Sequence, residues 1–298
     1  MVPYIDMHCD TLMRAWMRRR SDLLHLKGMV DLARLGAGGC KAQFFAVFLP
    51  PVELVRRLGP LFPSDEDYIK KCIAIFHHTA RLHPDLLAQA KTFEEIEKNA
   101  AAGKLSGILT LEDGRAVNGR MEHLDRFYRM GIRLISLTWN APNCFGEPNG
   151  SSGGLTPFGR EAVAHMNRIG MMVDVSHLSD RGFSEVAEIC RQNGKPFVAS
   201  HSNCRALTPH PRNLTDEMIR ALADCGGVIG VNFGPDFLEQ GQPRFRKESR
   251  IAAIVAHLKH MIRIGGTDCA AIGTDFDGIN GRLEIGSADR MPLLFDAL

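Results

Sequence analysis

The stretch Tyr4-Ile5-Asp6-Met7-His8-Cys9-Asp10 is a short run of apolar and β-favouring residues that ends in polar side chains. Seven similar runs follow along the chain, and short buried strands are the structure typical of such runs. The eight predicted strands cover residues 4–8, 42–48, 107–112, 133–138, 171–176, 197–200, 227–232 and 270–274.

Most of these runs precede a longer stretch with the period of an amphipathic helix. The predicted helices cover residues 66–81, 121–130, 158–169, 181–192, 216–224 and 249–264. Buried strands separated by single helices indicate a parallel sheet, and eight such units predict one (β/α)8 barrel domain over residues 1–298. A doubly wound open sheet is the alternative, although no G-x-G-x-x-G follows the first strand. Residues 275–298 show weak helical periodicity, so we expect the last barrel helix to be short, displaced or missing.

Composition excludes several classes of protein. With 45% hydrophobic and 23% charged residues, the chain can bury a sizeable core and is not disordered in bulk. A net charge of +2 is too balanced to argue for a nucleic acid or an anionic membrane as partner. No window approaches the ~18 consecutive apolar residues of a spanning helix, and residues 1–10 do not resemble a signal peptide. Eight scattered cysteines without a C-x-x-C pair predict reduced thiols in a cytoplasmic protein.

Five predicted strands end in histidine or carboxylate side chains. The carboxyl ends of barrel strands converge on one mouth, where the catalytic residues of barrel enzymes lie. The candidate residues at these ends are His8, Asp10, Glu112, His177, His201 and Asp275. Nitrogen and oxygen donors without thiolates suit Zn²⁺ or a similar divalent ion, and this number of ligands suits a pair of ions.

Each candidate also has a structural interpretation. Glu112 could form a salt bridge with Arg115, and Asp275 could cap a turn and leave the chemistry to Asp277. Cys9 and Cys204 flank site residues, but a thiolate nucleophile needs a base that the pattern does not single out. The other histidines fall in helices or loops and are interpreted as structural or exposed, with His210 left open; they are His25, His77, His78, His83, His123, His165, His257 and His260.

The chain resembles the membrane (renal) dipeptidase family of metallopeptidases, within the amidohydrolase-like barrels. The resemblance extends over almost the whole chain. The matching segments are Ile5–Asp10, Glu112, Leu137-Thr138, Gly153–Gly159, Asn167–Met171, Asp174–His177, Ser200–Ser202, Arg212-Asn213 and Gly273–Gly278. The H-x-D opening with a glutamate on the third strand is specific, because most other amidohydrolases open with H-x-H.

The resemblance implies a role for each site residue. His8 and Asp10 would bind one zinc, His177 and His201 the other, and Glu112 would bridge the two. Asp275 would shuttle the proton from water to the leaving amine, and Arg212 would hold the substrate carboxylate. The implied enzyme is a homodimeric dinuclear zinc dipeptidase acting on dipeptides with a free C-terminus, extending to D-residues at that end.

Two positions depart from the family pattern. Trp139, followed by Asn140, stands where well-known mammalian members have a substrate-contacting histidine, so Trp139 is a substrate-binding candidate and the substrate range is open. Family chains also continue past the segment that matches Gly273–Gly278, so a truncated C-terminal part is expected. Two alternatives stay open: hydrolysis of another small N-acyl amino acid or lactone, and an inactive barrel that acts as a binding protein.

Overall fold

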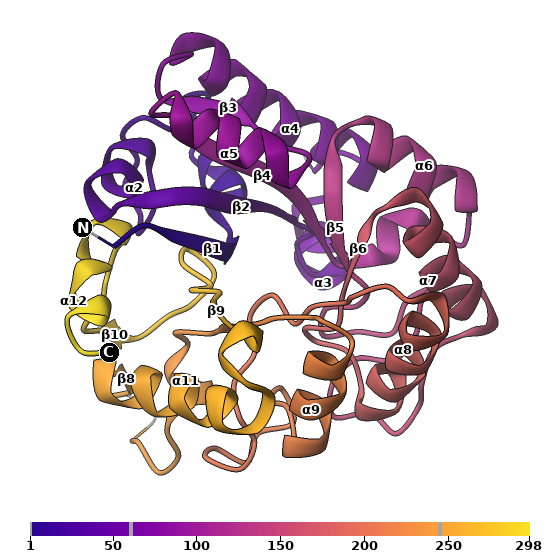
Figure 1. Ribbon diagram of the computed structural model, residues 1–298. Coiled ribbons are helices and arrows are strands. Elements are labelled where there is room, and N and C mark those ends of the chain that lie inside the picture. The colour runs from indigo at the N-terminus through magenta and orange to yellow at the C-terminus, as the bar shows by residue number, and fades with distance from the viewer. Residues whose placement is uncertain (1, 60–61, 244–245) are drawn as a thin grey trace.

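A curled sheet of parallel strands forms the centre of the computed structural model, which describes residues 2–59, 62–243 and 246–298, and helices surround the sheet (Figure 1). The order in the sheet is β6-β5-β4-β2-β1-β9-β7, and neighbours in this order are parallel. These strands are β1 (Tyr4–Cys9), β2 (Cys40–Phe48), β4 (Leu105–Glu112), β5 (Ile132–Ser136), β6 (Met172–Asp174), β7 (Ile229–Val231) and β9 (Ala270–Ile272).

Residues 198–199 close this sheet into a barrel. Strands β6 and β7 lie at the two edges of this sheet. Val198 forms a bridge to Asp174 of β6, and Ala199 forms a bridge to Ile229 of β7. The predicted (β/α)8 barrel is thereby confirmed. The sixth predicted strand, 197–200, lies in its expected place but pairs through two residues only.

Two glycines allow the chain to approach closely beside this bridge. A Cβ atom at Gly230 would lie 2.0 Å from the carbonyl oxygen of Ser200, and one at Gly273 would lie 1.9 Å from the same oxygen. No side chain fits at such distances, so the barrel closes here only because both positions are glycine.

All six predicted helices are confirmed, with shifts of at most two residues at their ends. They are α4 (Asp65–Leu82), α6 (Met121–Arg129), α7 (Pro157–Ile169), α8 (Asp180–Asn193), α9 (Asp216–Asp224) and α11 (Ile251–Gly265). A serine or threonine side chain precedes α4, α7, α8 and α9 and accepts a hydrogen bond from an amide of the first turn. This cap explains where these helices begin.

The elements that the sequence pattern did not predict are short. They are α1 (Thr11–Met17), α2 (Leu32–Gly38), α3 (Val52–Leu58), α5 (Phe93–Ala101), α10 (Pro235–Leu238), α12 (Pro292–Phe295), β3 (Leu87–Gln89), β8 (Glu248–Ser249), β10 (Arg282–Leu283) and the 3₁₀ turns Gly114–Val117, Thr267–Cys269 and Ala288–Arg290. Strand β3 pairs with the start of β4, and β8 pairs with β10 in a separate ribbon. Except for the nine-residue α5, these segments have two to seven residues and are too short to show a helical period.

The last helix is short, as expected. After β9 the helical elements of residues 273–298, all of which the structure describes, are the 3₁₀ turn at Ala288–Arg290 and the four-residue α12. This segment lies beside the start of β1, where the rings of Tyr4 and Phe295 are 5.6 Å apart, and Figure 1 shows the two ends of the chain on the same side of the barrel.

The two ends of the barrel differ in chemistry. At the N-terminal ends of the strands, Met7, Leu134 and Val198 form an apolar cluster beside a cavity of about 470 Å³.

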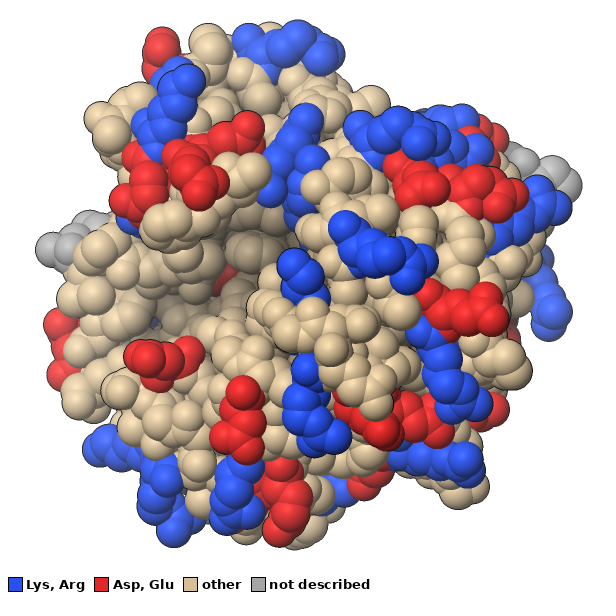
Figure 2. Space-filling model, turned by 45° about the vertical axis from the view of Figure 1, so that its right-hand side comes forward, with Lys and Arg blue, Asp and Glu red and all other residues tan. Residues whose placement is uncertain are grey.

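Figure 2 shows Lys and Arg side chains interspersed with Asp and Glu on one face, without a broad field of either sign, in agreement with the balanced net charge. Among the described helices, none is both long enough and apolar enough to cross a membrane.

Candidate metal centre

The register of the sheet places a row of polar residues at the carboxyl end of the barrel. Glu112 at the end of β4 is level with Ser136 of β5, and Ser136 is level with Asp174 of β6. All three are buried. Side chains that are level on adjacent parallel strands face the same side, so this row forms one wall of the site.

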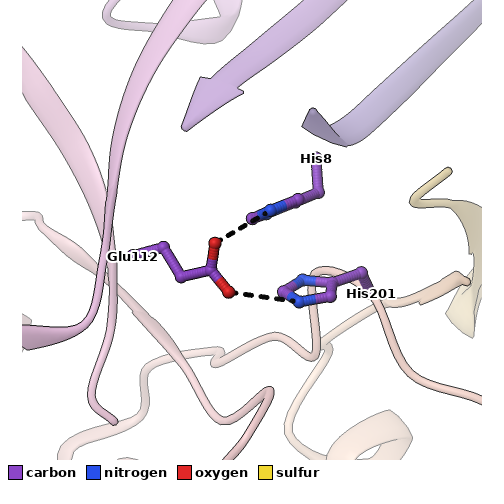
Figure 3. A group of neighbouring side chains, drawn as sticks. All are labelled: His8, Glu112 and His201. Atoms are coloured by element: carbon purple, nitrogen blue, oxygen red, sulfur yellow. Dashed lines mark ion pairs between the residues drawn. The ribbon is translucent and has the colours of Figure 1, made fainter. Parts of the chain in front are cut away.

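The carboxylate of Glu112 lies between histidines from different parts of the chain (Figure 3). Its Oε2 atom is 3.2 Å from His8 Nε2, and its Oε1 atom is 3.1 Å from His177 Nε2 and 3.7 Å from His201 Nε2. Each oxygen therefore serves one side of the site. This is the arrangement that a carboxylate shared by two cations requires.

The ring nitrogens of His177 and His201 face each other. Their Nε2 atoms are 3.0 Å apart, and Nδ1 of His177 lies 3.2 Å from the amide oxygen of Asn140, to which it can donate. Burial, with Arg212 and His8 adding repulsion, holds the pKa of both imidazoles well below the usual value, so both are neutral near pH 7. With the ring protons on Nδ1, two Nε2 lone pairs and Oε1 of Glu112 would converge on one point, which a positive charge would stabilise.

Asp10 and Asp275 complete the other side of the site. His8 Nε2 lies 3.9 Å from a carboxylate oxygen of each. Among the described residues, neither Asp10 Oδ1 nor His8 Nε2 has a hydrogen-bond partner, although both atoms are buried. Buried polar atoms without partners are costly, so these oxygen and nitrogen donors fit a divalent metal ion.

The protonation of the acids reflects this crowding. Burial raises the pKa of Glu112 to about 7, with His8 opposing the shift and Asp10 adding to it. Burial likewise raises the pKa of Asp275 to about 6. For His8, burial opposes protonation, but Glu112 and Asp10 outweigh it and raise the pKa. A bound cation would favour the ionised carboxylates and remove this strain.

The structure separates Asp275 from Asp277. Oδ2 of Asp275 accepts a hydrogen bond of 2.9 Å from the side-chain amide of Asn232, which leaves Oδ1 toward His8. Asp277 instead accepts hydrogen bonds of 2.8 Å from Thr11 and from the amide of Met29. Asp277 thus stabilises the fold, whereas Asp275 faces the candidate metal ligands.

Glu112 does not form the salt bridge with Arg115 that the sequence allowed. Arg115 pairs with Asp65 at 3.0 Å and with Asp113 at 2.9 Å, and not with Glu112. The carboxylate of Glu112 is therefore left to the histidines.

Arg212 is a buried cation near the acids. It is 4% exposed, and its Nη1 donates to the hydroxyl of Ser202 at 2.7 Å. Its Nε and Nη2 atoms have no hydrogen-bond partner in the part of the chain that the structure describes. Burial lowers its pKa to about 10, so the guanidinium stays charged at neutral pH. An incoming carboxylate would supply the missing acceptors.

A cavity of about 260 Å³ opens onto the site. Its polar lining includes Asp10, Glu112, Asn140, His177 and Asp275, and its apolar lining includes Met13, Phe48, Trp139 and Phe237. The ring of Trp139 packs edge-on against Phe48, with centroids 5.1 Å apart. Trp139 thus lies where a substrate side chain could contact it, whereas His8, His201 and Arg212 do not belong to the lining of this cavity.

Several functional partners were not assigned a role from the sequence. Asn140, Ser200 and Asn232 each contact a candidate site residue, and Asp174 contacts Ser200. Asp174, Ser200 and Asn232 lie in or at the ends of predicted strands, which was the available signal. Three of the contacts join distant positions, because Asn140 is 37 residues from His177, Asp174 is 26 from Ser200 and Asn232 is 43 from Asp275. Of the remaining histidines, His210 accepts a bond from the amide of Arg212.

Comparisons with known proteins agree with this geometry. A profile of the membrane dipeptidase family, peptidase family M19, matches residues 1–298. A protein encoded in the pqqA 5′ region of Klebsiella pneumoniae is 37% identical over 238 residues, which cover 77% of this chain and 84% of that protein. Dipeptidase verJ of Clonostachys rogersoniana is 30% identical over 293 residues, covering 93% of this chain and 73% of its own.

Solved structures share the fold. A metallopeptidase from Rhodobacter sphaeroides, liganded with a phosphinate mimic of the dipeptide L-Ala-D-Ala, superposes with a TM-score of 0.86 at 29% identity, covering 99% of this chain and 92% of that chain. The metallopeptidase described as dipeptidase AC superposes with a TM-score of 0.87 at 30% identity, covering 99% and 91%.

Proposed function

Because the chain belongs to the membrane dipeptidase family and is a metallodipeptidase, we propose that it hydrolyses dipeptides with a free C-terminal carboxylate at a centre of two zinc ions. The observation that carries this proposal is the placement of Glu112, which offers one oxygen to His8 and the other to His177 and His201. In this proposal His8 and Asp10 would hold one ion, His177 and His201 would hold the other, and Glu112 would contribute one oxygen to each.

The bound ions would polarise the scissile carbonyl and lower the pKa of a water molecule. Side chains of the protein transfer the proton and orient the groups that react. Asp275 accepts the proton of the attacking water and delivers it to the leaving amine, a role for which a carboxyl group with a pKa raised by burial is suited. The hydrogen bond from Asn232 keeps its Oδ1 atom toward the site.

Arg212 binds the C-terminal carboxylate of the substrate in this proposal. Its two unpartnered nitrogens offer a bidentate fork for a planar anion. Trp139 and Phe48 form an apolar wall that contacts a substrate side chain. The dipeptide mimic bound to the Rhodobacter sphaeroides relative ends in D-alanine, which supports extending the proposed substrates to D-residues at that end.

The test is a metal analysis combined with a hydrolysis screen. The purified protein should contain close to two equivalents of divalent metal and should cleave free dipeptides in preference to their C-terminal amides. Preferred hydrolysis of N-acyl amino acids or lactones would favour the alternative substrate class instead. Uptake of at most one equivalent at saturating zinc, by well-folded protein, would contradict the dinuclear centre.

The homodimer and the cytoplasmic location stay predictions. All eight cysteines are free thiols in the described structure, which is compatible with a reducing compartment. Sedimentation analysis and fractionation of cells that express the chain would test them.

A further inference from the structure

Asp174 is a buried carboxylate without an assigned role, and it lies directly behind a candidate metal ligand. It ends strand β6 and is 0% exposed. Its Oδ1 atom accepts from the backbone amides of Ser176 and Ser200, at 3.0 and 2.8 Å. Its Oδ2 atom accepts from the hydroxyls of Ser136 and Ser200, at 2.5 and 2.6 Å.

The hydroxyl of Ser200 connects this carboxylate to His201. Its oxygen lies 2.7 Å from Nδ1 of His201. A serine hydroxyl has one proton, and the ionised carboxylate, which only accepts, is the stronger partner for it. The serine oxygen then accepts from His201, so the ring proton must lie on Nδ1. Nε2 of His201 keeps its lone pair, and this atom faces Glu112 and His177.

We propose that Asp174, acting through Ser200, fixes His201 in the tautomer whose Nε2 is unprotonated, and thereby sets the affinity of the site for metal. Asp174 is a positioning residue in this scheme. The effect on metal affinity rests on the proposed metal centre, whereas the tautomer of His201 is a property of the protein without metal. Hydrogen bonds that orient a metal-binding histidine from behind commonly change metal affinity by about 10–100-fold.

Asp174→Asn should reverse the chain of hydrogen bonds. Because two backbone amides donate to the position of Oδ1, the amide oxygen of the variant must occupy it. The amide nitrogen then replaces Oδ2 and donates to the hydroxyl of Ser200. That hydroxyl must turn its proton toward Nδ1 of His201, and the ring proton moves to Nε2, where it blocks metal binding.

Ser200→Ala and Ser136→Ala form a matched pair. Both remove a buried hydroxyl that donates to Oδ2 of Asp174, so both should lower thermal stability to a similar extent. Only Ser200→Ala removes the contact with His201. A purely structural role of Asp174 predicts equal effects of the two variants on metal binding.

The experiment reads the tautomer of His201 by ¹⁵N NMR in the metal-free protein, with His201→Gln to assign the signals. We expect an Nδ1 proton in the wild type and in Ser136→Ala, a mixture in Ser200→Ala, and an Nε2 proton in Asp174→Asn. Zinc competition with a chelator should show affinity about 10–100-fold weaker in Ser200→Ala and close to wild type in Ser136→Ala.

An Nε2 proton on His201 of the wild type, or equal zinc affinities of the two alanine variants, would overturn the proposal. The serine pair keeps the test decisive should Asp174→Asn fail to fold. Since the tautomer is measured without metal, it decides the role of Asp174 separately from the zinc titration of the wild type, which tests the proposed function.

Discussion

Asn232 donates its side-chain amide to Oδ2 of Asp275 at 2.9 Å, although the two residues are 43 positions apart. This bond engages one oxygen of Asp275 and leaves the other 3.9 Å from Nε2 of His8. Asp275 also holds a left-handed backbone conformation, with φ of 60°, which is uncommon outside glycine. The fold thus aims one particular oxygen of this acid into the site.

Asp275→Asn should abolish proton transfer and leave the metal ligands in place. We expect both metals to remain bound and kcat to fall at least about a hundredfold. Asp277→Asn is the matched control. It should lower stability by about 1–3 kcal/mol through its hydrogen bonds to Thr11 and Met29, with kcat nearly unchanged. Near-normal kcat in metal-loaded Asp275→Asn would remove Asp275 from the mechanism.

The same substitution should change the pH dependence of stability of the metal-free protein. Burial raises the pKa of Asp275 from 3.8 to about 6, so the folded state holds this proton more tightly than the unfolded state does. Its contribution to stability is therefore lost as pH rises through this window. The free energy of unfolding of Asp275→Asn, relative to wild type, should rise by about 1–3 kcal/mol between pH 4 and pH 6. Urea denaturation in a chelator checks this, and a constant difference would contradict it.

Glu112→Gln should lower the occupancy of both metal positions together. An amide has one oxygen to offer, whereas the carboxylate of Glu112 faces His8 with one oxygen and His177 with the other. Metal analysis after dialysis against limiting zinc checks this result. Loss of one equivalent with the other held at wild-type affinity would show that Glu112 does not bridge.

Arg212→Ala should impair substrate binding and leave the metal content unchanged. Removing one partner of a buried charged pair costs about 2–5 kcal/mol in transition-state stabilisation. The loss should appear in kcat/KM for free dipeptides and be small for their C-terminal amides. If the wild type cleaves both substrates equally well, Arg212 does not bind the carboxylate.

Gly278→Ala should displace the carboxylates of Asp10 and Asp275, because the added methyl group would overlap with both. A Cβ atom at Gly278 would lie 2.0 Å from Oδ2 of Asp10 and 2.6 Å from Oδ1 of Asp275. Both carboxylates must move, so we expect zinc affinity and kcat to fall at least about tenfold. Gly36→Ala is the control, since its Cβ meets nothing within 4 Å in helix α2. Full activity of Gly278→Ala would show that the positions of these oxygens are not critical.

The sequence by itself determined the alternation of strands and helices and the residues that stand at the strand ends. These features are local: the period of apolar residues reports which face is buried, and His8, Glu112 and His201 stand at the ends of such runs. The convergence of strand ends in a parallel barrel then predicts that these residues meet. The structure brings them together around Glu112.

Only the tertiary structure decided which partner each side chain has. Arg115 pairs with Asp65 rather than Glu112, Asp275 rather than Asp277 faces His8, and Asp174 holds Ser200 behind His201. The strand at 197–200 likewise exists only through its bridges to β6 and β7. Such contacts join residues tens to hundreds of positions apart and depend on register and close approach, which a local pattern of apolar and polar residues does not record.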